Sequence, residues 1–411
     1  MENLEDIKNI ARKCLNCKNP SCVHNCPLEN HIPQILNYIK EDDISRAKQE
    51  LLKTTNVSFI CSSLCDYDKQ CYGNCILNKT PKGGVEFYKV EKYLSKLISN
   101  DDYMIEKQFD DNVAIIGAGV AGITVAIELA KVGFNVTIYE KKNYIGGVIN
   151  DSLPSFRYDS NNINVLNKIL QQLNVNIKYN CDFGHNLLLD DLKKYNQLVF
   201  ANGTYLTKST LSNHPQVLDG LKILQDAKKH QLNIQNKDIL VIGGGNVAMD
   251  VARTLKRNNN NVSIVYRRNI KNAPSSIKEI NDTIAEGVKF LELLSPNKIN
   301  NKNEKLILEV EKNILVNDPT SSRMMFNPTG EFINIECDFV VEAIGINADY
   351  CYLKEMIPSL FTEKGWPKEF IKFGNQNIYT TGDYYNGSTN FAKASKQAIL
   401  TSNLIKENIC K

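Results

Sequence analysis

The sequence predicts an α/β protein in which a helical, cysteine-rich N-terminal domain precedes two Rossmann-like dinucleotide-binding domains. Eight of the 12 cysteines fall between Cys14 and Cys75. Two glycine-rich turns, at 117–122 and 243–248, each follow a short apolar strand pattern and open a helical one. Strand and helix patterns alternate around and after these turns, which is typical of parallel sheets covered by helices.

Composition excludes several classes of protein. The 411 residues provide for two to three domains. A net charge of +3 argues against a nucleic-acid-binding protein, which needs a clustered basic surface. No apolar run reaches the ~18 residues of a membrane span, and the N-terminus lacks the apolar core of a secretory signal. We therefore expect a cytoplasmic protein without nucleic-acid or membrane partners, and nearly balanced charges in residues 1–108 predict no basic patch there.

The N-terminal cysteines are spaced as metal ligands. They form two runs of four: Cys14-x2-Cys17-x4-Cys22-x3-Cys26-Pro27 and Cys61-x3-Cys65-x5-Cys71-x3-Cys75. Dense cysteines in a cytosolic chain bind metal more often than they form disulfides, and eight thiolates suit two zinc or iron–sulfur sites. Zinc is the less favoured alternative because it exchanges no electrons with the dinucleotide sites that follow. The stretch 32–52 has a helical pattern.

The first glycine motif predicts a dinucleotide site. Gly117 permits a tight turn after the strand VAII, Gly119 lets the backbone approach a pyrophosphate, and Gly122 lets helix and strand pack closely. Glu140 follows at the end of the strand VTIYE, where a carboxylate accepts the ribose hydroxyls of an adenosine. A glycine-rich turn without a ligand is the less favoured alternative.

The second glycine motif predicts a nicotinamide nucleotide site. Its candidate binding residues, between the strand ILVI and a helical pattern, are Gly243, Gly245, Asn246 and Ala248. Tyr266 stands where the first motif has its acid, and Arg267 and Arg268 follow it. A guanidinium pair there suits the 2′-phosphate of NADPH, with a solvated basic turn as the alternative.

Between two later strand-like runs, residues 297–305 are expected to form a polar turn, and the Asn run at 258–261 a surface loop without function.

Three further features resemble flavoproteins with two dinucleotide domains. Gly382 and Asp383 follow a strand near the C-terminus, as does the acid that bonds the ribityl or pyrophosphate part of the flavin in that family. The doublet Gly146-Gly147 allows the cofactor a close approach. Strand ends LVFANG and VVEAIG mark where the chain would leave and re-enter the flavin domain. The resemblance implies an NADPH domain at 230–345 inserted into an FAD domain at 109–229 and 346–411, after an iron–sulfur domain at 1–108.

The segments RKCLNCKNPSCVHNCPLENHIP and CSSLCDYDKQCYGNC, with the tail GDYYNG, resemble the glutamate synthase small subunit and equally the N-terminal half of dihydropyrimidine dehydrogenase. This resemblance implies FAD, NADPH and two 4Fe-4S clusters. The first cluster's implied ligands are Cys14, Cys17, Cys22 and Cys75. The second's are Cys26, Cys65, Cys71 and a non-cysteine ligand at Glu91, with Cys61 spare. Spacing alone leaves Cys61 open as the fourth ligand. Where relatives have GIPxxRLP this chain has SLPSFRYD, which keeps Arg157 as a candidate cofactor contact.

These features predict an oxidoreductase that carries electrons from NADPH through FAD to the clusters. No catalytic side chain is expected, since hydride passes between cofactors. The resemblance implies that a larger catalytic subunit, or a ferredoxin-like acceptor, receives the electrons, as for the glutamate synthase small subunit. The alternatives are the nucleotide-binding subunit of a two-chain dihydropyrimidine dehydrogenase and, in another class, a non-catalytic iron–sulfur scaffold. A scaffold would have no need of the glycine motifs.

Overall fold

A computed structural model describes residues 3–211, 214–302, 304–318 and 324–410. It divides into two compact units. The first comprises Met1–Asn150, Arg157–Thr204 and Ala348–Lys411, and the second Asp151–Phe156 and Tyr205–Asn347. The second unit is thus inserted into the first. It begins earlier than residue 230, because the segment just before that position pairs into its sheet.

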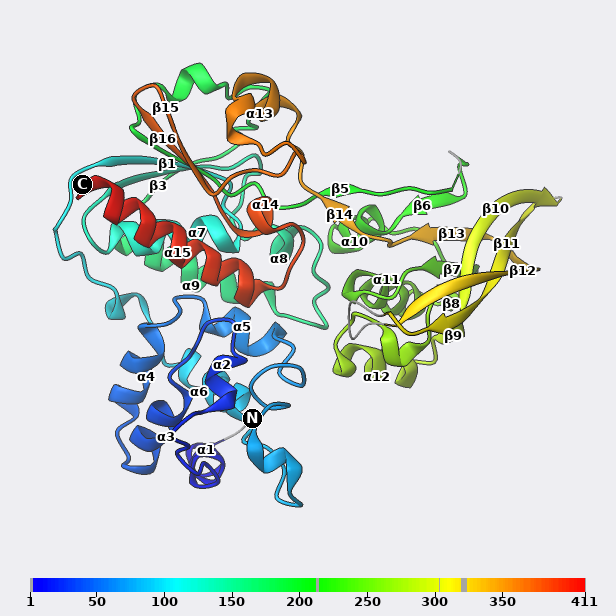
Figure 1. Ribbon diagram of the computed structural model, residues 1–411, viewed down its shortest axis with the longest axis horizontal. Helices are drawn as coiled ribbons and strands as arrows, with labels where there is room; N and C mark the ends of the chain where they lie inside the picture. Colours follow the sequence, from blue (N-terminus) through cyan, green and yellow to red (C-terminus); the bar gives the residue numbers. More distant parts are fainter. Residues whose placement is uncertain (1–2, 212–213, 303, 319–323, 411) are drawn as a thin grey trace. The chain divides into compact units, whose positions relative to one another are not determined.

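The N-terminal part of the first unit is helical (Figure 1, blue). Its helices are α1 (Leu4–Arg12), α2 (Ser21–His24), α3 (Ile32–Lys40), α4 (Ile44–Leu52), α5 (Ser58–Leu64) and α6 (Phe87–Ser95). The stretch 32–52 is two helices, because Asp42 adopts a positive φ and the Asp43 carboxylate caps the second helix by accepting from the Arg46 N–H at 3.0 Å. Apolar faces of α1, α3, α4 and α6 form one buried core around Ile35 and Val90. This core holds the cysteine-bearing loops at its surface.

The rest of the first unit is a six-stranded sheet in the order β15-β16-β4-β1-β2-β3. Its strands are β1 (Asn112–Ile116), β2 (Asn135–Tyr139), β3 (Asn176–Lys178), β4 (Gln197–Phe200), β15 (Phe370–Phe373) and β16 (Gln376–Thr380). All neighbours are parallel except β15 and β16. The helices are α7 (Val120–Ala130), α8 (Val148–Asp151), α9 (Ile163–Gln172), α13 (Cys351–Met356), α14 (Gly382–Asn386) and α15 (Phe391–Ile409), and α7 packs against α15. The carboxyl ends of β1, β2 and β4 thereby meet where ligands bind in such sheets.

The second unit has a parallel five-stranded sheet in the order β6-β13-β7-β8-β9. These strands are β6 (Val217–Asp219), β7 (Asp238–Ile242), β8 (Asn261–Tyr266), β9 (Lys289–Glu292) and β13 (Phe339–Glu342), with helices α10 (Gly220–Lys228), α11 (Asn246–Arg257) and α12 (Ile277–Ala285). The short pair β5 (Leu206–Thr207) and β14 (Ile346–Asn347) lies where the long inserted segment, Tyr205–Asn347, begins and ends.

Three long antiparallel strands complete the second unit: β10 (Leu294–Lys302), β11 (Lys305–Val316) and β12 (Met325–Cys337). The polar turn expected at 297–305 is therefore wrong for most of its length, since residues up to Lys302 continue β10. None of the helices in the described part of the chain combines the length and apolar character needed to cross a membrane.

Candidate cofactor sites

The first glycine loop joins β1 to α7 and leaves room for a ligand at one position. A Cβ on Gly117 would lie 2.6 Å from the carbonyl oxygen of Ala201, and Gly117 has a φ of +105°. A Cβ on Gly122 would lie 2.0 Å from the Gly117 oxygen, so helix and strand need this glycine to pack. No atom lies within 4 Å of a Cβ placed on Gly119. The open face at Gly119, before the N-terminus of α7, fits a pyrophosphate.

Glu140 and the glycine doublet are hydrogen-bonded to this loop. The Glu140 carboxylate is 6% exposed and accepts from the backbone N–H groups of Ala118 at 2.7 Å and Lys142 at 2.9 Å. A carboxylate has about four acceptor sites, so two remain for ribose hydroxyls. Gly146 donates its N–H to the Ala118 oxygen at 2.8 Å. A Cβ on Gly147 would lie 3.0 Å from the Gly119 Cα, so a side chain there would crowd the open face.

The C-terminal motif reaches the same loop. A Cβ on Gly382 would lie 2.4 Å from the Ala121 Cβ in the first turn of α7. Asp383 accepts from the Thr389 N–H at 3.1 Å and from its hydroxyl at 2.6 Å, and burial raises the pKa of the Asp383 carboxyl. The structure thus brings together the glycine loop, Glu140, the doublet and Gly382-Asp383. Arg157, by contrast, is half-buried at the point where the chain returns to the first unit.

Asn202 is a candidate that sequence reasoning missed. It follows β4 in the chain, and its Cα lies 3.4 Å from a Cβ placed on Gly117. Its side-chain oxygen is buried and accepts no hydrogen bond from any described residue. An orphaned buried acceptor beside a nucleotide loop fits a cofactor hydroxyl. The only signal in the sequence was its place in the strand end LVFANG.

The second glycine loop repeats the first. A Cβ on Gly243 would lie 2.4 Å from the Ala343 oxygen and 3.2 Å from the Ala248 Cβ, whereas one on Gly245 would have no neighbour within 4 Å. The loop again leaves its second motif position open for a phosphate. Asn246 has a supporting contact, since its side-chain oxygen accepts from the Ser275 hydroxyl at 2.6 Å and from the Ser276 N–H at 3.1 Å.

The two arginines after β8 differ in their surroundings. Arg267 is exposed, with its guanidinium carbon 5.0 Å from the centre of the Phe326 ring. Arg268 is 9% exposed and donates from Nε to the Met324 oxygen at 2.7 Å, with its guanidinium carbon 5.3 Å from the same ring. Arg267 is therefore the accessible phosphate-binding candidate, and Arg268 secures the strand beside it.

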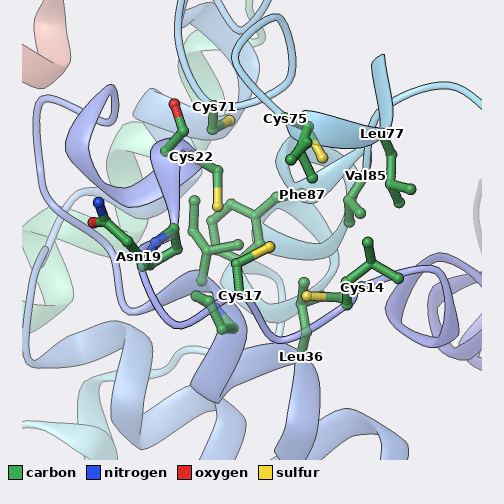
Figure 2. A pocket seen from close by; sticks show the side chains of 16 residues that line it. Cys14, Cys17, Asn19, Cys22, Leu36, Cys71, Cys75, Leu77, Val85 and Phe87 are labelled. Atoms are coloured by element: carbon green, nitrogen blue, oxygen red, sulfur yellow. The ribbon is translucent and has the colours of Figure 1, made fainter. Parts of the chain in front are cut away.

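Five cysteines line one cavity in the helical part of the first unit. They are Cys14, Cys17, Cys22, Cys71 and Cys75, and their side chains are seen around it in Figure 2. Burial raises the pKa of Cys22 to about 12, with further contributions from Cys75, Cys14 and Cys17. The four implied ligands of the first cluster, Cys75 included, thus all line this cavity, and their assignment as ligands stays a prediction.

A second thiol group surrounds Glu91 on α6. Burial raises the pKa of the Glu91 carboxyl to about 8, and its Oε1 accepts from the Asn30 amide at 3.3 Å. Burial and, next, Glu91 raise the pKa of Cys26 to about 11, and the same two causes raise the pKa values of Cys61 and Cys65. The pKa of Cys71 is also raised, first by burial and then by Cys26 and Glu91. Both candidates for the fourth ligand, Glu91 and Cys61, thus lie in this group.

The thiols around the cavity fit an iron–sulfur cluster. Within the described residues, no three Cys, His, Asp or Glu side chains converge so as to hold a single metal ion. Thiols that surround a cavity fit a polynuclear group such as an iron–sulfur cluster. The ligands bind as thiolates, and the raised pKa values make these thiols harder to deprotonate. The free energy of binding such a group must therefore offset the cost of deprotonation.

Two family models match the chain. Residues 111–398 match pyridine nucleotide-disulphide oxidoreductase, and residues 2–103 match dihydropyrimidine dehydrogenase domain II, 4Fe-4S cluster. The boundary between them falls in the segment that joins the helical part to β1.

Individual proteins are similar over most of the chain. The glutamate synthase [NADPH] small chain of Azospirillum brasilense is 27% identical over 375 residues, 86% of this chain and 77% of that protein. The NAD-dependent dihydropyrimidine dehydrogenase subunit PreT of Salmonella typhimurium is 28% identical over 296 residues, 70% of this chain and 71% of that one. Mycobacterium tuberculosis FprA in complex with NADPH shares the fold, with a TM-score of 0.61 and 18% identity over 74% of this chain and 85% of that chain.

Proposed function

Since this chain belongs to the pyridine nucleotide-disulphide oxidoreductase family and carries a 4Fe-4S domain, we propose that it is the electron-input subunit of a larger enzyme. It is an NAD(P)H-dependent flavin and iron–sulfur oxidoreductase similar to glutamate synthase small chains. The proposal adds NADPH as donor, FAD as its acceptor, two clusters and a larger partner. The observation that carries it is the presence of two open nucleotide loops and two groups of clustered thiols in one chain.

The proposed cofactor chemistry leaves the protein the tasks of binding and orientation. When bound, FAD would supply a two-electron acceptor for a hydride from NADPH, and 4Fe-4S clusters would supply one-electron acceptors for its oxidation. In the first unit, Gly119 and the N-terminus of α7 bind the pyrophosphate, Glu140 accepts ribose hydroxyls, and Asn202 and Asp383 are further acceptors. No side chain has to move a proton, so the rate depends on holding the two rings in register.

In the second unit, Gly245 and the N-terminus of α11 face the pyrophosphate of the nicotinamide nucleotide, and Arg267 pairs with its 2′-phosphate. The proposed functional domains are 1–108 for the clusters, 109–229 with 346–411 for FAD, and 230–345 for NADPH, with the NADPH domain extended back to Tyr205 because β6 pairs into its sheet. The first cluster takes Cys14, Cys17, Cys22 and Cys75, and the second takes Cys26, Cys65, Cys71 and Glu91.

Two acceptor enzymes fit these carriers. A glutamate synthase large subunit is favoured by the similarity over 86% of the chain to a small chain of that enzyme. A dihydropyrimidine dehydrogenase partner is favoured by the match of residues 2–103 and by the similarity to PreT.

The purified protein tests the proposal directly. NADPH added without oxygen should bleach a bound flavin, and a tetrazolium dye should be reduced continuously. Co-purification from the native source should then recover a larger chain. Flavin that NADPH does not reduce would contradict the proposed donor, and a purified protein without flavin would support the scaffold alternative.

A further inference from the structure

Two large aliphatic side chains are exposed beside the first thiol group, by which we mean the cysteines that line the cavity: Cys14, Cys17, Cys22, Cys71 and Cys75. Leu15 is 63% exposed and Ile76 is 57% exposed, and both line the cavity that holds Cys14 and Cys75. Each is the next residue along the chain from one of those cysteines. Single exposed aliphatic residues are ordinary, but two at the mouth of one cavity, each beside a ligand candidate, indicate a surface that another molecule covers.

The segments around this mouth are positively charged. Residues 12–28 and 69–85 contain no acidic residue. Exposed lysines in these segments that form no ion pair with any described residue are Lys13, Lys18, Lys79 and Lys82. Lys40 adds a further charge, since its ammonium donates to the Cys14 oxygen at 3.0 Å.

Two acidic residues of the same domain are engaged elsewhere. Asp42 pairs with Lys8, and Glu50 pairs with Lys53 at 2.7 Å. The nearly balanced charge of residues 1–108 thus conceals a local excess of lysine in these two segments. Folding brings two acid-free segments, far apart in sequence, around one cavity.

We propose that this surface docks the electron acceptor, and that the acceptor is a redox protein or subunit with acidic side chains around an apolar centre. We call the surface the cluster face and define it by Leu15, Ile76, Lys13, Lys18, Lys79 and Lys82. The apolar pair forms the centre and the lysines form the rim, which is the usual anatomy of a protein interface. This inference rests on the proposed function, because electrons leave from the group that Cys14 and Cys75 hold.

Binding to proteins of opposite charge tests the cluster face without turnover. The holoprotein, purified without oxygen, is immobilised and exposed to an acidic plant-type [2Fe-2S] ferredoxin and to the basic protein cytochrome c. Ferredoxin should bind at low salt and cytochrome c should not. Binding should weaken as salt rises, because the Debye length falls from about 10 Å at 0.1 M to about 3 Å at 1 M.

A charge-reversed variant identifies the surface. Lys13→Glu, Lys18→Glu, Lys79→Glu and Lys82→Glu together should weaken ferredoxin binding about tenfold or more, chiefly by slowing association. The matched control reverses four exposed lysines elsewhere: Lys168, Lys289, Lys364 and Lys372. It changes net charge equally and should retain most of the affinity. Leu15→Ser with Ile76→Ser should instead speed dissociation and leave the salt dependence unchanged.

Three outcomes would overturn the cluster face: equal losses in both charge-reversed variants, no loss in either, or binding to phosphatidylcholine–phosphatidylglycerol vesicles in preference to ferredoxin. Dye reduction by NADPH separates this inference from the proposed function. If dye reduction fails in the unmodified protein while ferredoxin binds as expected, the proposed function is wrong and the docking surface stands. If dye reduction succeeds without salt-sensitive ferredoxin binding, the cluster face is wrong.

Discussion

In the proposed nicotinamide nucleotide site, a single guanidinium, that of Arg267, is expected to favour NADPH over NADH. Arg267 is exposed whereas Arg268 is buried against Met324 and Phe326. We expect Arg267→Ala to weaken NADPH binding by about 10- to 150-fold with little effect on NADH, because a charge-assisted phosphate contact contributes roughly 1.5–3 kcal/mol. Steady-state KM values for both nucleotides measure this. Arg268→Ala should instead lower the melting temperature, and an unmodified protein that favours NADH would refute the assignment.

The fourth ligand of the proposed second cluster is a choice between two residues, Glu91 and Cys61. Glu91 is 4% exposed and Cys61 is 2% exposed, so both lie deep in the same thiol group. If Glu91 is the ligand, Glu91→Ala should lose about four of about eight iron atoms, whereas Cys61→Ser should keep them. Iron and sulfide analysis with EPR of the reduced protein measures this. Loss of iron in Cys61→Ser alone would reverse the assignment.

Single positions also show what sequence patterns can reveal. Gly117, Gly119 and Gly122 could be assigned separate tasks because a local turn sets the demands on each, and the structure bears out the geometry. The Asn run was misjudged, since Asn260 is 3% exposed and its amide donates to the Ile234 and Leu255 oxygens at 2.8 and 2.9 Å. Those partners depend on how the chain folds back, and no local pattern records that.

Among the elements, α11 and α12 are joined by one buried cation. Arg253 pairs with Glu279 at 2.6 Å and with Glu286 at 2.8 Å, and its guanidinium carbon lies 4.6 Å from the Phe156 ring centre. We expect Arg253→Met to cost about 3–5 kcal/mol, because Glu279 loses its buried cationic partner. Arg257→Met, at a half-exposed position, should cost about 1 kcal/mol or less. Urea unfolding followed by circular dichroism compares the two, and equal costs would contradict the distinction.

Strand prediction succeeded where one face is buried and failed where neither is. The alternation in β11 buries Leu306, Leu308 and Val310, so a strand-like run was visible in the sequence. β12 is exposed along most of its length, and the polar residues of β10 resemble a turn. In such strands the backbone ladder, rather than side-chain burial, determines the structure, so hydrophobic periodicity carries no signal.

For the whole molecule, the metal content is the first quantity to measure. Two thiol groups predict about eight iron atoms with matching sulfide, and one open nucleotide loop in the first unit predicts one FAD per chain. Anaerobic purification followed by iron, sulfide and flavin analysis checks this. Stoichiometric zinc without sulfide would contradict the cluster assignment.

Electron routing is the property that depends on the entire chain. In the proposed route, flavin reduction needs only the two nucleotide loops, whereas onward transfer needs the first thiol group. Cys14→Ser should therefore leave flavin reduction by NADPH intact in stopped-flow absorbance, abolish the EPR signal of the first cluster, and stop transfer to a co-purified larger subunit. Cys351→Ser, at an exposed cysteine in α13, is the matched control and should change none of these.

The variant also tests folding, because ligand binding to a cluster supplies folding free energy to a small domain. Circular dichroism must show that Cys14→Ser keeps its helices before its kinetics can be interpreted. If the helices melt, Leu15→Ser with Ile76→Ser provides the second test, since it leaves every proposed ligand in place and should slow transfer to the same subunit without changing flavin reduction. A folded Cys14→Ser protein that fed its partner at the normal rate would show that electrons bypass the first cluster.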